Sequence, residues 1–381
     1  MEELDVGVCI GGFKAAGVRD GKYGVALIVA DGDCEYVGAY TRNAVKAAPV
    51  ELMMERTGPL RAVIANSGNA NCCMKTGVDD AKKIVDEFSK ILGCSPEGIG
   101  VASTGIIGRK IDVEKVTGLA YKAFEKLGDD AKSIEAAAKS LMTTDSFSKS
   151  FAVDVNGVKV GGIAKGAGMI DPSMATMLCF ITTNARLSKE ELGKTLCEVV
   201  DETFNMICVD GDMSTNDTVM LLSNQTQACS REDFKTALGR VCVEIAKMIA
   251  FDGEGATKRV TVEVKGAKTI EDARKAVKAI SRSNLVRTAI AGGNPNWGRI
   301  TAAVGTVVDY DWRKMSISYS GGGETYMIVE CGVGQDLKPA EKILRNRDLK
   351  LTVNLAIGDA SAVGYTCDMT EAYVKINKEY S

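Results

Sequence analysis

The sequence contains no histidine among its 381 residues. Without imidazole, neither a Ser-His-Asp nor a Cys-His mechanism is available, and the commonest transition-metal ligand is missing. Any catalytic nucleophile in this chain therefore needs another base, and we expect neither a metal nor a cofactor.

The sequence also lacks a large excess of positive or negative charge, and it lacks long apolar runs. The formal net charge is only -3, and the lysines and arginines are scattered, so the basic surface that nucleic acid requires is missing. No apolar run approaches the length of a membrane span, and residues 1–5 carry acids where a secretory signal carries bases. We expect a cytoplasmic protein that binds small molecules and has no nucleic-acid or membrane partner.

Cysteine is dilute for a disulfide framework, since twelve are spread over the chain and none is spaced as Cys-x-x-Cys. Free cysteine behaves as a small hydrophobic residue, so the composition predicts reduced thiols that are mostly buried.

The chain is longer than proteins that fold around a single hydrophobic core usually are, which predicts two domains or two packed halves. Strand and helix patterns alternate throughout and predict an α+β fold with layered sheets covered by helices. The expected strands are 25–30, 62–66, 151–155, 158–160, one through 181, and those near 260 and 286, and the expected helices are 79–92, 113–127, 132–142, 189–204, 232–249, 271–280 and 338–344. Asn156-Gly157 is a strong hairpin signal.

The segment 165–185 carries the chemistry. It is a glycine-rich turn followed by Pro172, a junction of small residues and an apolar strand. The carbonyl of Ala175 lies next to the hydroxyl of Thr176. If the fold twists this peptide bond, the hydroxyl can attack the carbonyl and release a new N-terminal threonine.

An N-terminal threonine solves the problem of the missing histidine. Its free α-amine, with an ordinary pKa of about 8, can act as the general base for its own hydroxyl. On residue type alone, Thr176 is more often an ordinary β-branched residue of a buried strand.

The surrounding motifs decide between these interpretations, because together they resemble the argJ family of ornithine acetyltransferases, also called bifunctional glutamate N-acetyltransferases. The similarity covers essentially the whole chain. Besides 165–185, its blocks are 65–71 (ANSGNAN), 103–108 (STGIIG), 142–145 (MTTD), 209–218 (VDGDMSTNDT), 252–258 (DGEGATK), 294–299 (NPNWGR) and 373–377 (YVKIN).

The resemblance implies a self-cleaving, N-terminal-nucleophile-type acyltransferase of the DmpA/argJ-like architecture. Cleavage at Ala175-Thr176 would give fragments 1–175 and 176–381, which assemble as a heterotetramer of two α and two β chains. Thr176 becomes the acetylated nucleophile, and Thr104 and Gly105 match the oxyanion-hole pair.

The resemblance also implies the substrates and the residues that bind them. Acetyl passes from N-acetylornithine to glutamate in arginine biosynthesis, with acetyl-CoA open as a second donor. The substrate-binding positions match Thr143 (or the adjacent Thr144), Lys165, Thr176, Glu254 and Asn377. Ser381 takes the place of a terminal Thr or Ser that family members carry a residue or so further on.

Other functions fit the sequence less well. An aminopeptidase or amidohydrolase of the same architecture would share the junction but not the later blocks, and a binding protein that never cleaves is a further alternative. Gly193-Lys194-Thr195 suggests a nucleotide-binding loop, but Ser188 stands where the P-loop requires glycine. The acidic run 210–217 lacks the glycine and the closing glutamate of a calcium loop at the required positions.

Overall fold

The computed structural model describes residues 1–171 and 177–379. These residues form two compact units. Of the described chain, unit one contains 1–166, 177–205 and 213–245, and unit two contains 167–171, 206–212 and 246–379. Each unit takes segments from both predicted fragments. The fragments 1–175 and 176–381 meet at a bond outside the described residues, so that boundary stays a prediction.

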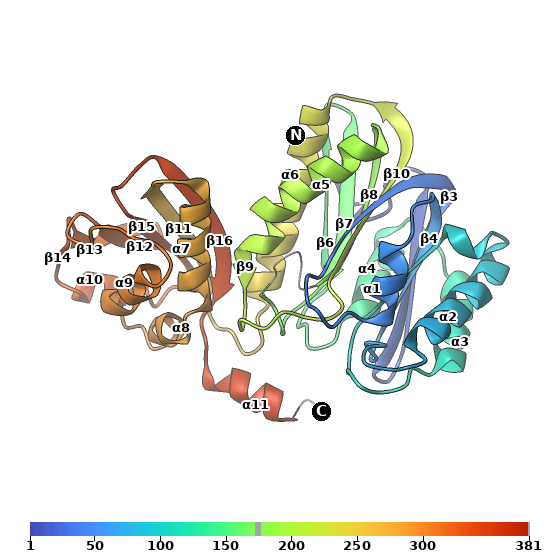
Figure 1. Ribbon diagram of the computed structural model, residues 1–381, viewed down its shortest axis with the longest axis horizontal. Helices are drawn as coiled ribbons and strands as arrows, with labels where there is room; N and C mark the ends of the chain where they lie inside the picture. The colour runs from blue at the N-terminus through green and yellow to red at the C-terminus, as the bar shows by residue number, and fades with distance from the viewer. Residues whose placement is uncertain (172–176, 380–381) are drawn as a thin grey trace. The chain divides into compact units, whose positions relative to one another are not determined.

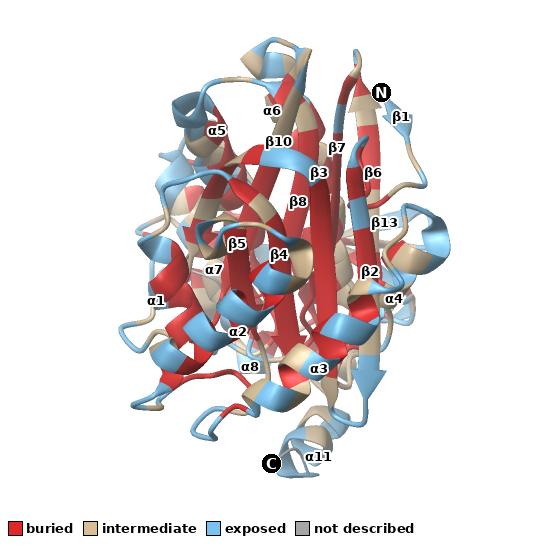
Figure 2. Cartoon of the chain, turned by 90° about the vertical axis from the view of Figure 1, so that its right-hand side faces the viewer, coloured by how far each residue is buried: buried red, intermediate tan, exposed pale blue. Residues whose placement is uncertain are grey.

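Unit one is built on a nine-stranded sheet with the order β1-β6-β7-β8-β10-β3-β4-β5, in which β2 also pairs with β3. The strands are β1 (Glu2–Glu3), β2 (Phe13–Asp20), β3 (Tyr23–Tyr40), β4 (Leu60–Ser67), β5 (Ile99–Ser103), β6 (Lys149–Val155), β7 (Val158–Lys165), β8 (Leu178–Arg186) and β10 (Thr218–Ala228). Figure 2 shows the central strands in the colour of buried residues along most of their length. The apolar stretches 25–30 in β3, 62–65 in β4 and 178–181 in β8 are what burial on both faces requires.

The predicted hairpin forms between β6 and β7. Val155 pairs with Val158, and both turn residues have positive φ, 54° at Asn156 and 86° at Gly157. Positive φ at both positions is the requirement of the tightest hairpin turn, which Asn-Gly meets at low cost. This hairpin sets the register that brings Lys165 to the end of β7.

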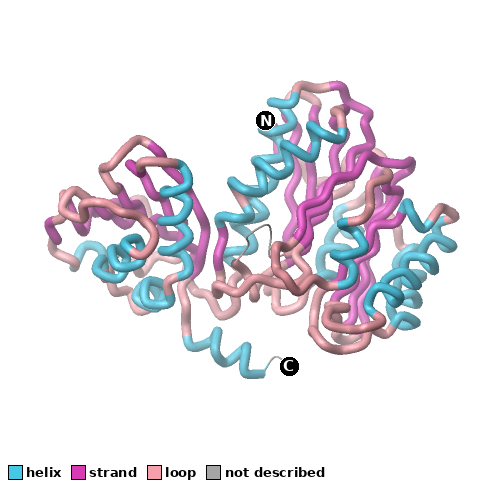
Figure 3. Tube along the Cα trace, viewed as in Figure 1, coloured by secondary structure: helices cyan, strands magenta, loops and turns pink. Residues whose placement is uncertain are grey.

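Helices flank the strands of unit one (Figures 1 and 3). They are α1 (Ala48–Met54), α2 (Gly77–Leu92), α3 (Val113–Phe124), α4 (Ala131–Leu141), α5 (Lys189–Glu202) and the first part of α6 (Arg231–Phe251), with a short 3₁₀ turn η1 (Pro96–Gly98). α3 and α4 pack on β2 and β3, and α5 packs on β3. Ser188 and Glu191 form a reciprocal capping box at the start of α5. Gly193-Lys194-Thr195 therefore lies inside a helix, where it cannot form a phosphate-binding loop.

Unit two contains a seven-stranded sheet with the order β14-β13-β12-β15-β11-β16-β9. Its strands are β9 (Ile207–Cys208), β11 (Arg259–Ala267), β12 (Ser316–Gly321), β13 (Glu324–Glu330), β14 (Val333–Gly334), β15 (Asp348–Asn354) and β16 (Ala360–Cys367), and its helices are η2 (Phe204–Met206, which crosses the unit boundary), the end of α6, α7 (Ile270–Arg282), α8 (Asn284–Ala291), α9 (Trp297–Gly305), α10 (Lys338–Ile343) and α11 (Glu371–Glu379). α7 packs on β11 and β16, and α10 packs on β12 and β13. The α+β class with helices packed on sheets is confirmed.

One predicted strand was wrong. Val286 lies in α8, where the Ser283 side chain accepts a hydrogen bond from the Val286 N–H and caps the helix. β-Branched residues favour strands only weakly, and a serine cap followed by a buried helical face outweighs that preference.

The thiol prediction is confirmed. All twelve cysteines are free, and seven of them are buried. Across residues 1–171 and 177–379, no helix combines the length and the apolar character needed to cross a membrane.

Candidate active site

Three predicted site residues lie outside the described part of the chain: Ala175, Thr176 and Ser381. The residue that follows Thr176 is described. Met177 is buried, and its carbonyl oxygen accepts a hydrogen bond of 2.8 Å from the Thr218 N–H at the start of β10. This bond fixes the beginning of β8 against β10.

The ends of three strands align next to Met177. In β8, Leu178 pairs with Lys165 of β7 on one side and with Thr218 of β10 on the other. Lys165 is therefore one strand away from the chain that leaves Thr176. The sheet register, which short-range sequence patterns do not reveal, produces this proximity.

Thr104 and Gly105 follow directly after β5. The Thr104 N–H donates to the Asn66 carbonyl oxygen at 2.9 Å, and both Thr104 and Gly105 are half-buried. Gly105 has a φ of +131°, and a Cβ at this position would lie 2.5 Å from the Asn69 nitrogen. Only glycine fits here, because any side chain would combine backbone strain with a backbone clash.

Asn216 connects the Thr104 turn to the chain that follows Thr176. Its buried Nδ2 donates to the Ser103 and Ala70 carbonyl oxygens, both at 2.7 Å. Two residues later, Thr218 holds Met177. The predicted oxyanion-hole pair and the start of β8 are thus attached to one short segment, 216–218.

Thr143 and Lys165 meet at a shared carboxylate. Asp145 Oδ2 accepts the Thr143 N–H at 3.0 Å and lies 3.9 Å from the Lys165 Nζ. Asp145 Oδ1 accepts the Gly166 N–H at 2.6 Å and pairs with the Lys149 Nζ at 2.8 Å. Asp145 therefore fixes both predicted substrate-binding positions of unit one and the first glycine after β7.

This carboxylate is charged despite its burial. Burial by itself would raise the pKa of Asp145, but the Lys165 and Lys149 ammonium groups and the Gly166 N–H outweigh burial and hold the pKa below its ordinary value. The side chains of Asp145 and Lys149 have no exposed surface. A buried charge of this kind requires its partners, so the cluster has one stable arrangement.

In unit two, the predicted residues Glu254 and Asn377 contact each other. The Asn377 Nδ2 donates to Glu254 Oε2 at 2.7 Å, so α11 places its amide on the carboxylate. The Glu254 N–H donates to the Ala167 carbonyl oxygen at 3.0 Å. A Cβ on Gly168 would lie 2.7 Å from Glu254 Oε2, so the glycine leaves room for the carboxylate.

The turn that precedes the predicted junction is held by Asp210. Its carboxylate accepts the Met169 N–H at 2.6 Å and the Ile170 N–H at 2.9 Å. Burial raises the pKa of Asp210 even though these N–H groups lower it. Met169 has a φ of +55°, a conformation that costs energy for any residue with a side chain.

Asp171, the last described residue before the junction, is fixed by two cations of α7. Lys278 lies 2.5 Å from its Oδ1, and Arg282 pairs with its Oδ2. Burial lowers the pKa of Lys278, and the adjacent Asp171 opposes that shift. The chain that enters residues 172–176 therefore starts from an anchored point.

Sequence reasoning gave no role to Asp145, Asn216 or Asp210, although each lies in a block that resembles the family. Their blocks, MTTD and VDGDMSTNDT, are polar, so residue type gave no signal that these three side chains are buried or held in place. The identity of their hydrogen-bonding partners comes from the fold alone.

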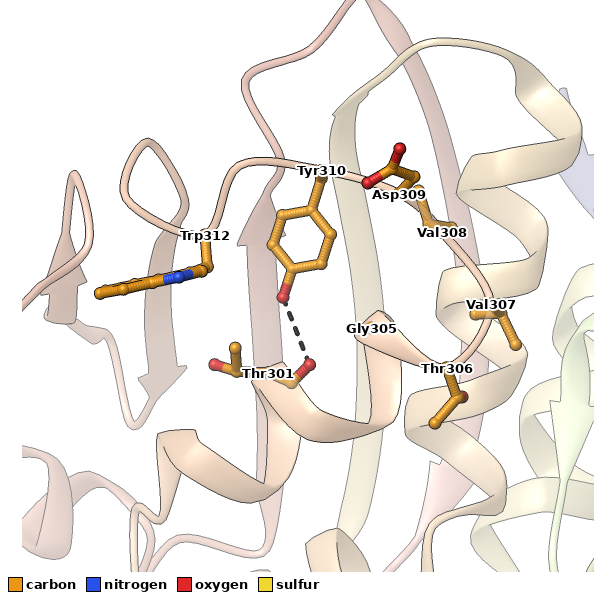
Figure 4. A pocket seen from close by; sticks show the side chains of 8 residues that line it. All are labelled: Thr301, Gly305, Thr306, Val307, Val308, Asp309, Tyr310 and Trp312. Atoms are coloured by element: carbon orange, nitrogen blue, oxygen red, sulfur yellow. Dashed lines mark hydrogen bonds between the residues drawn. The ribbon is translucent and has the colours of Figure 1, made fainter.

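The predicted site residues do not line the surface pocket of unit two shown in Figure 4. This pocket encloses about 430 Å³ at the end of α9 and the segment that follows it. Tyr310 closes one side, and its hydroxyl donates to the Thr301 carbonyl oxygen at 3.3 Å.

Known proteins share both the sequence and the fold. The sequence model of the ArgJ family matches residues 11–381. The chain is 46% identical to the glutamate N-acetyltransferase of Methanocaldococcus jannaschii over 402 aligned residues, which cover 100% of both chains. It is 43% identical to the glutamate N-acetyltransferase of Methanothermobacter thermautotrophicus, with 98% of this chain and 97% of the relative covered.

A solved structure agrees with these relatives. The arginine biosynthesis bifunctional protein argJ of Bacillus halodurans superposes with a TM-score of 0.50 at 36% identity, and the match covers 53% of this chain and 98% of that chain. The named relatives are acetyltransferases, and the layered α+β fold agrees with that of the solved relative, so the chain falls in a class of acetyltransferases. The chain belongs to the ArgJ family, which confirms the resemblance and the enzyme class that it implied.

Proposed function

We propose that this enzyme transfers acetyl from N-acetylornithine to glutamate through an acetyl ester on Thr176, within arginine biosynthesis. The observation that carries the proposal is the 216–218 segment. Through Asn216 it holds the Thr104 turn, and through Thr218 it holds the residue after Thr176. A nucleophile and an oxyanion hole have to be fixed relative to each other, and this segment supplies that connection.

Maturation comes first in the proposed sequence of reactions. The Thr176 hydroxyl attacks the Ala175 carbonyl carbon, the C–N bond breaks to give an ester, and water then hydrolyses the ester. The products are fragments 1–175 and 176–381. The Bacillus halodurans relative supports this step, because nearly all of that chain matches only about half of this one, as a cleaved fragment would.

Acetyl transfer then uses the new α-amine as base. The amine takes the Thr176 hydroxyl proton while the oxygen attacks the acetyl carbonyl of N-acetylornithine. The Thr104 hydroxyl and the Gly105 N–H stabilise the oxyanion. Ornithine leaves with the proton, and the glutamate α-amine attacks the acetyl ester to give N-acetylglutamate.

The side-chain charges of Lys165 and Glu254 are opposite to the charges that the substrates carry. Both substrates carry an α-carboxylate, which we assign to Lys165 with Thr143 beside it. The δ-ammonium of N-acetylornithine is assigned to Glu254, with Asn377 orienting the Glu254 carboxylate. Ser381 is assigned a substrate contact by resemblance alone. No cofactor takes part in this reaction; acetyl-CoA as a second donor and the heterotetramer remain part of the proposal.

Gel electrophoresis and a product assay test the proposal together. Under denaturing conditions the purified protein should give two bands of similar mass, and incubation with N-acetylornithine and glutamate should give ornithine and N-acetylglutamate. Thr176→Ala should remain one intact chain and make no product. Acetate in place of N-acetylglutamate would indicate a hydrolase, and an intact wild-type chain that still turns over would contradict the proposed nucleophile.

A further inference from the structure

Two adjacent thiols lie on the loop that supports the Thr104 turn. Cys72 is buried, Cys73 is exposed, and their Sγ atoms lie 3.7 Å apart. Cys73 has a positive φ of +60°, and Asn71, two residues earlier, also has a positive φ, +47°. This left-handed backbone turns two consecutive side chains to the same side, where regular strand geometry would separate them.

The separation suits a single bridging atom better than a disulfide. Two sulfurs bound at about 2.3 Å to one centre lie about 3.3 Å apart for the near-right angles of a pyramidal centre and about 3.8 Å apart for a tetrahedral one. A disulfide needs a sulfur separation of about 2.05 Å and Cα atoms more than about 4.4 Å apart, whereas adjacent Cα atoms are about 3.8 Å apart. A disulfide would therefore strain the loop, whereas a bridging atom needs the two sulfurs to move together only slightly.

We propose that Cys72 and Cys73 form a dithiol site for one soft, thiophilic centre of low coordination number, with trivalent arsenic as the representative ligand. Across 1–171 and 177–379, no group of three or more His, Cys, Asp or Glu side chains is placed to share a metal ion. The pair thus offers two sulfurs, and the ligand's remaining bond is to its own carbon or oxygen.

The chemistry at the site is ligand exchange without oxidation or reduction. With phenylarsine oxide, the exposed Cys73 sulfur bonds to arsenic first and Cys72 closes the ring. Two As–S bonds form, the oxide oxygen leaves as water with both thiol protons, and arsenic stays trivalent.

Occupation of the site should lower activity, because the added phenylarsenic group and the closing of the two sulfurs act on a loop that shares hydrogen bonds with the residues after Gly105. The Gly108 N–H donates to the Cys72 carbonyl oxygen at 3.1 Å, and the Ala70 N–H donates to the Ile106 carbonyl oxygen at 3.0 Å. These bonds attach the loop to the residues that directly follow Thr104 and Gly105. Inhibition rests on the proposed acetyl transfer, whereas binding of arsenic does not.

Mass spectrometry of the whole protein separates the two claims. Titration with phenylarsine oxide should add one phenylarsenic group, less two hydrogens, per chain, and peptide mapping should place it on 72–73. Cys73→Ser and Cys72→Ala should each weaken binding at least about a hundredfold, since a monothiol arsenic bond lacks the chelate ring. Cys331→Ser, which removes an exposed and isolated thiol, should bind as the wild type does.

The reversal of binding provides a second measurement. A dithiol reagent should remove the arsenic, and a monothiol at the same thiol concentration should not. Undiminished binding to Cys73→Ser, or arsenic mapped elsewhere, would overturn the site. Full occupation with unchanged turnover of N-acetylornithine would overturn the inhibitory coupling, and an enzyme inactive on that substrate would count against the proposed function while the mass measurement still tests the site.

Discussion

Asn216 donates one hydrogen bond to the Ser103 carbonyl oxygen, directly before Thr104, and a second to the Ala70 carbonyl oxygen. Its Oδ1 accepts the Thr215 hydroxyl at 2.7 Å. One buried amide therefore ties together β5, the 69–73 loop and the strand that holds Met177. In the proposed mechanism Asn216 is a positioning residue, which acts on acetyl transfer through the groups that it orients.

Asn216→Asp tests this role with almost no change of shape. The variant keeps an acceptor for Thr215 but turns an oxygen toward two carbonyl oxygens, so it loses both donated bonds. We expect a loss of about 1–3 kcal/mol in the free energy of unfolding and a fall in kcat of about tenfold to a hundredfold from misplacement, with little change in KM. Urea unfolding and initial rates measure these quantities. Asn294→Ala, at an exposed asparagine, is the control. If Asn216→Asp kept the kcat of the wild type, Asn216 would have no positioning role.

Gly105 should tolerate no side chain. Gly105→Ala introduces a Cβ at 2.5 Å from the Asn69 nitrogen and a conformation that costs about 1–3 kcal/mol for alanine. Displacement of the proposed oxyanion donor should lower kcat by about a hundredfold to a thousandfold.

Gly108→Ala is the matched control for that variant. Gly108 also has positive φ, +78°, but its Cβ would meet nothing within 4 Å. It should share the part of the stability loss that comes from backbone strain and keep most of the activity. Equal losses of activity in both alanine variants would show that backbone strain alone, and not the position of the donor, explains the effect.

The fold was predictable where local rules are strong. Asn156-Gly157 determines its own turn, and Ser188 with Glu191 caps a helix from four residues of sequence. The strand predicted near Val286 was wrong because the local rule there is weak: a single β-branched residue favours a strand less than the Ser283 cap favours a helix. Thr143 and Lys149 lie within four residues of Asp145. Its other partners, Lys165 and Gly166, come from the end of β7 and the residue after it, and no local pattern encodes those contacts. The resemblance gave Lys165 and Thr143 a role, but only the sheet register shows that one carboxylate serves both.

Asp145→Asn should lower stability in a pH-dependent way. Removing one member of a buried ion pair costs about 3–5 kcal/mol, because Lys149 and Lys165 lose their counter-charge. The folded-state pKa of Asp145 lies below its unfolded value. Its contribution is therefore complete above the ordinary pKa of about 4 and is lost as the pH falls below that value toward the folded pKa.

Urea unfolding at several pH values between about 3 and 6 checks the sign. The difference in unfolding free energy between wild type and Asp145→Asn should shrink as the pH falls through this range. Asp359→Asn, at an exposed position, should leave the curve unchanged. A difference that is independent of pH would mean that Asp145 contributes only through its shape.

Glu254→Gln should separate the two halves of the reaction. N-acetylornithine carries a δ-ammonium and glutamate does not, so under the proposed assignment only the first half-reaction uses the Glu254 charge. In a ping-pong mechanism, kcat/KM for each substrate reports its own half-reaction. We expect kcat/KM for N-acetylornithine to fall about tenfold to a hundredfold, which corresponds to a charged hydrogen bond of about 1.5–3 kcal/mol, while kcat/KM for glutamate changes little.

Glutamine keeps an oxygen that accepts the Asn377 amide, so α11 should stay in place, and Glu371→Gln on the exposed side of that helix is the matched control. Equal losses for both substrates would instead assign Glu254 to a group that they share, the α-carboxylate region or the reacting centre, and would contradict its role as the partner of the δ-ammonium.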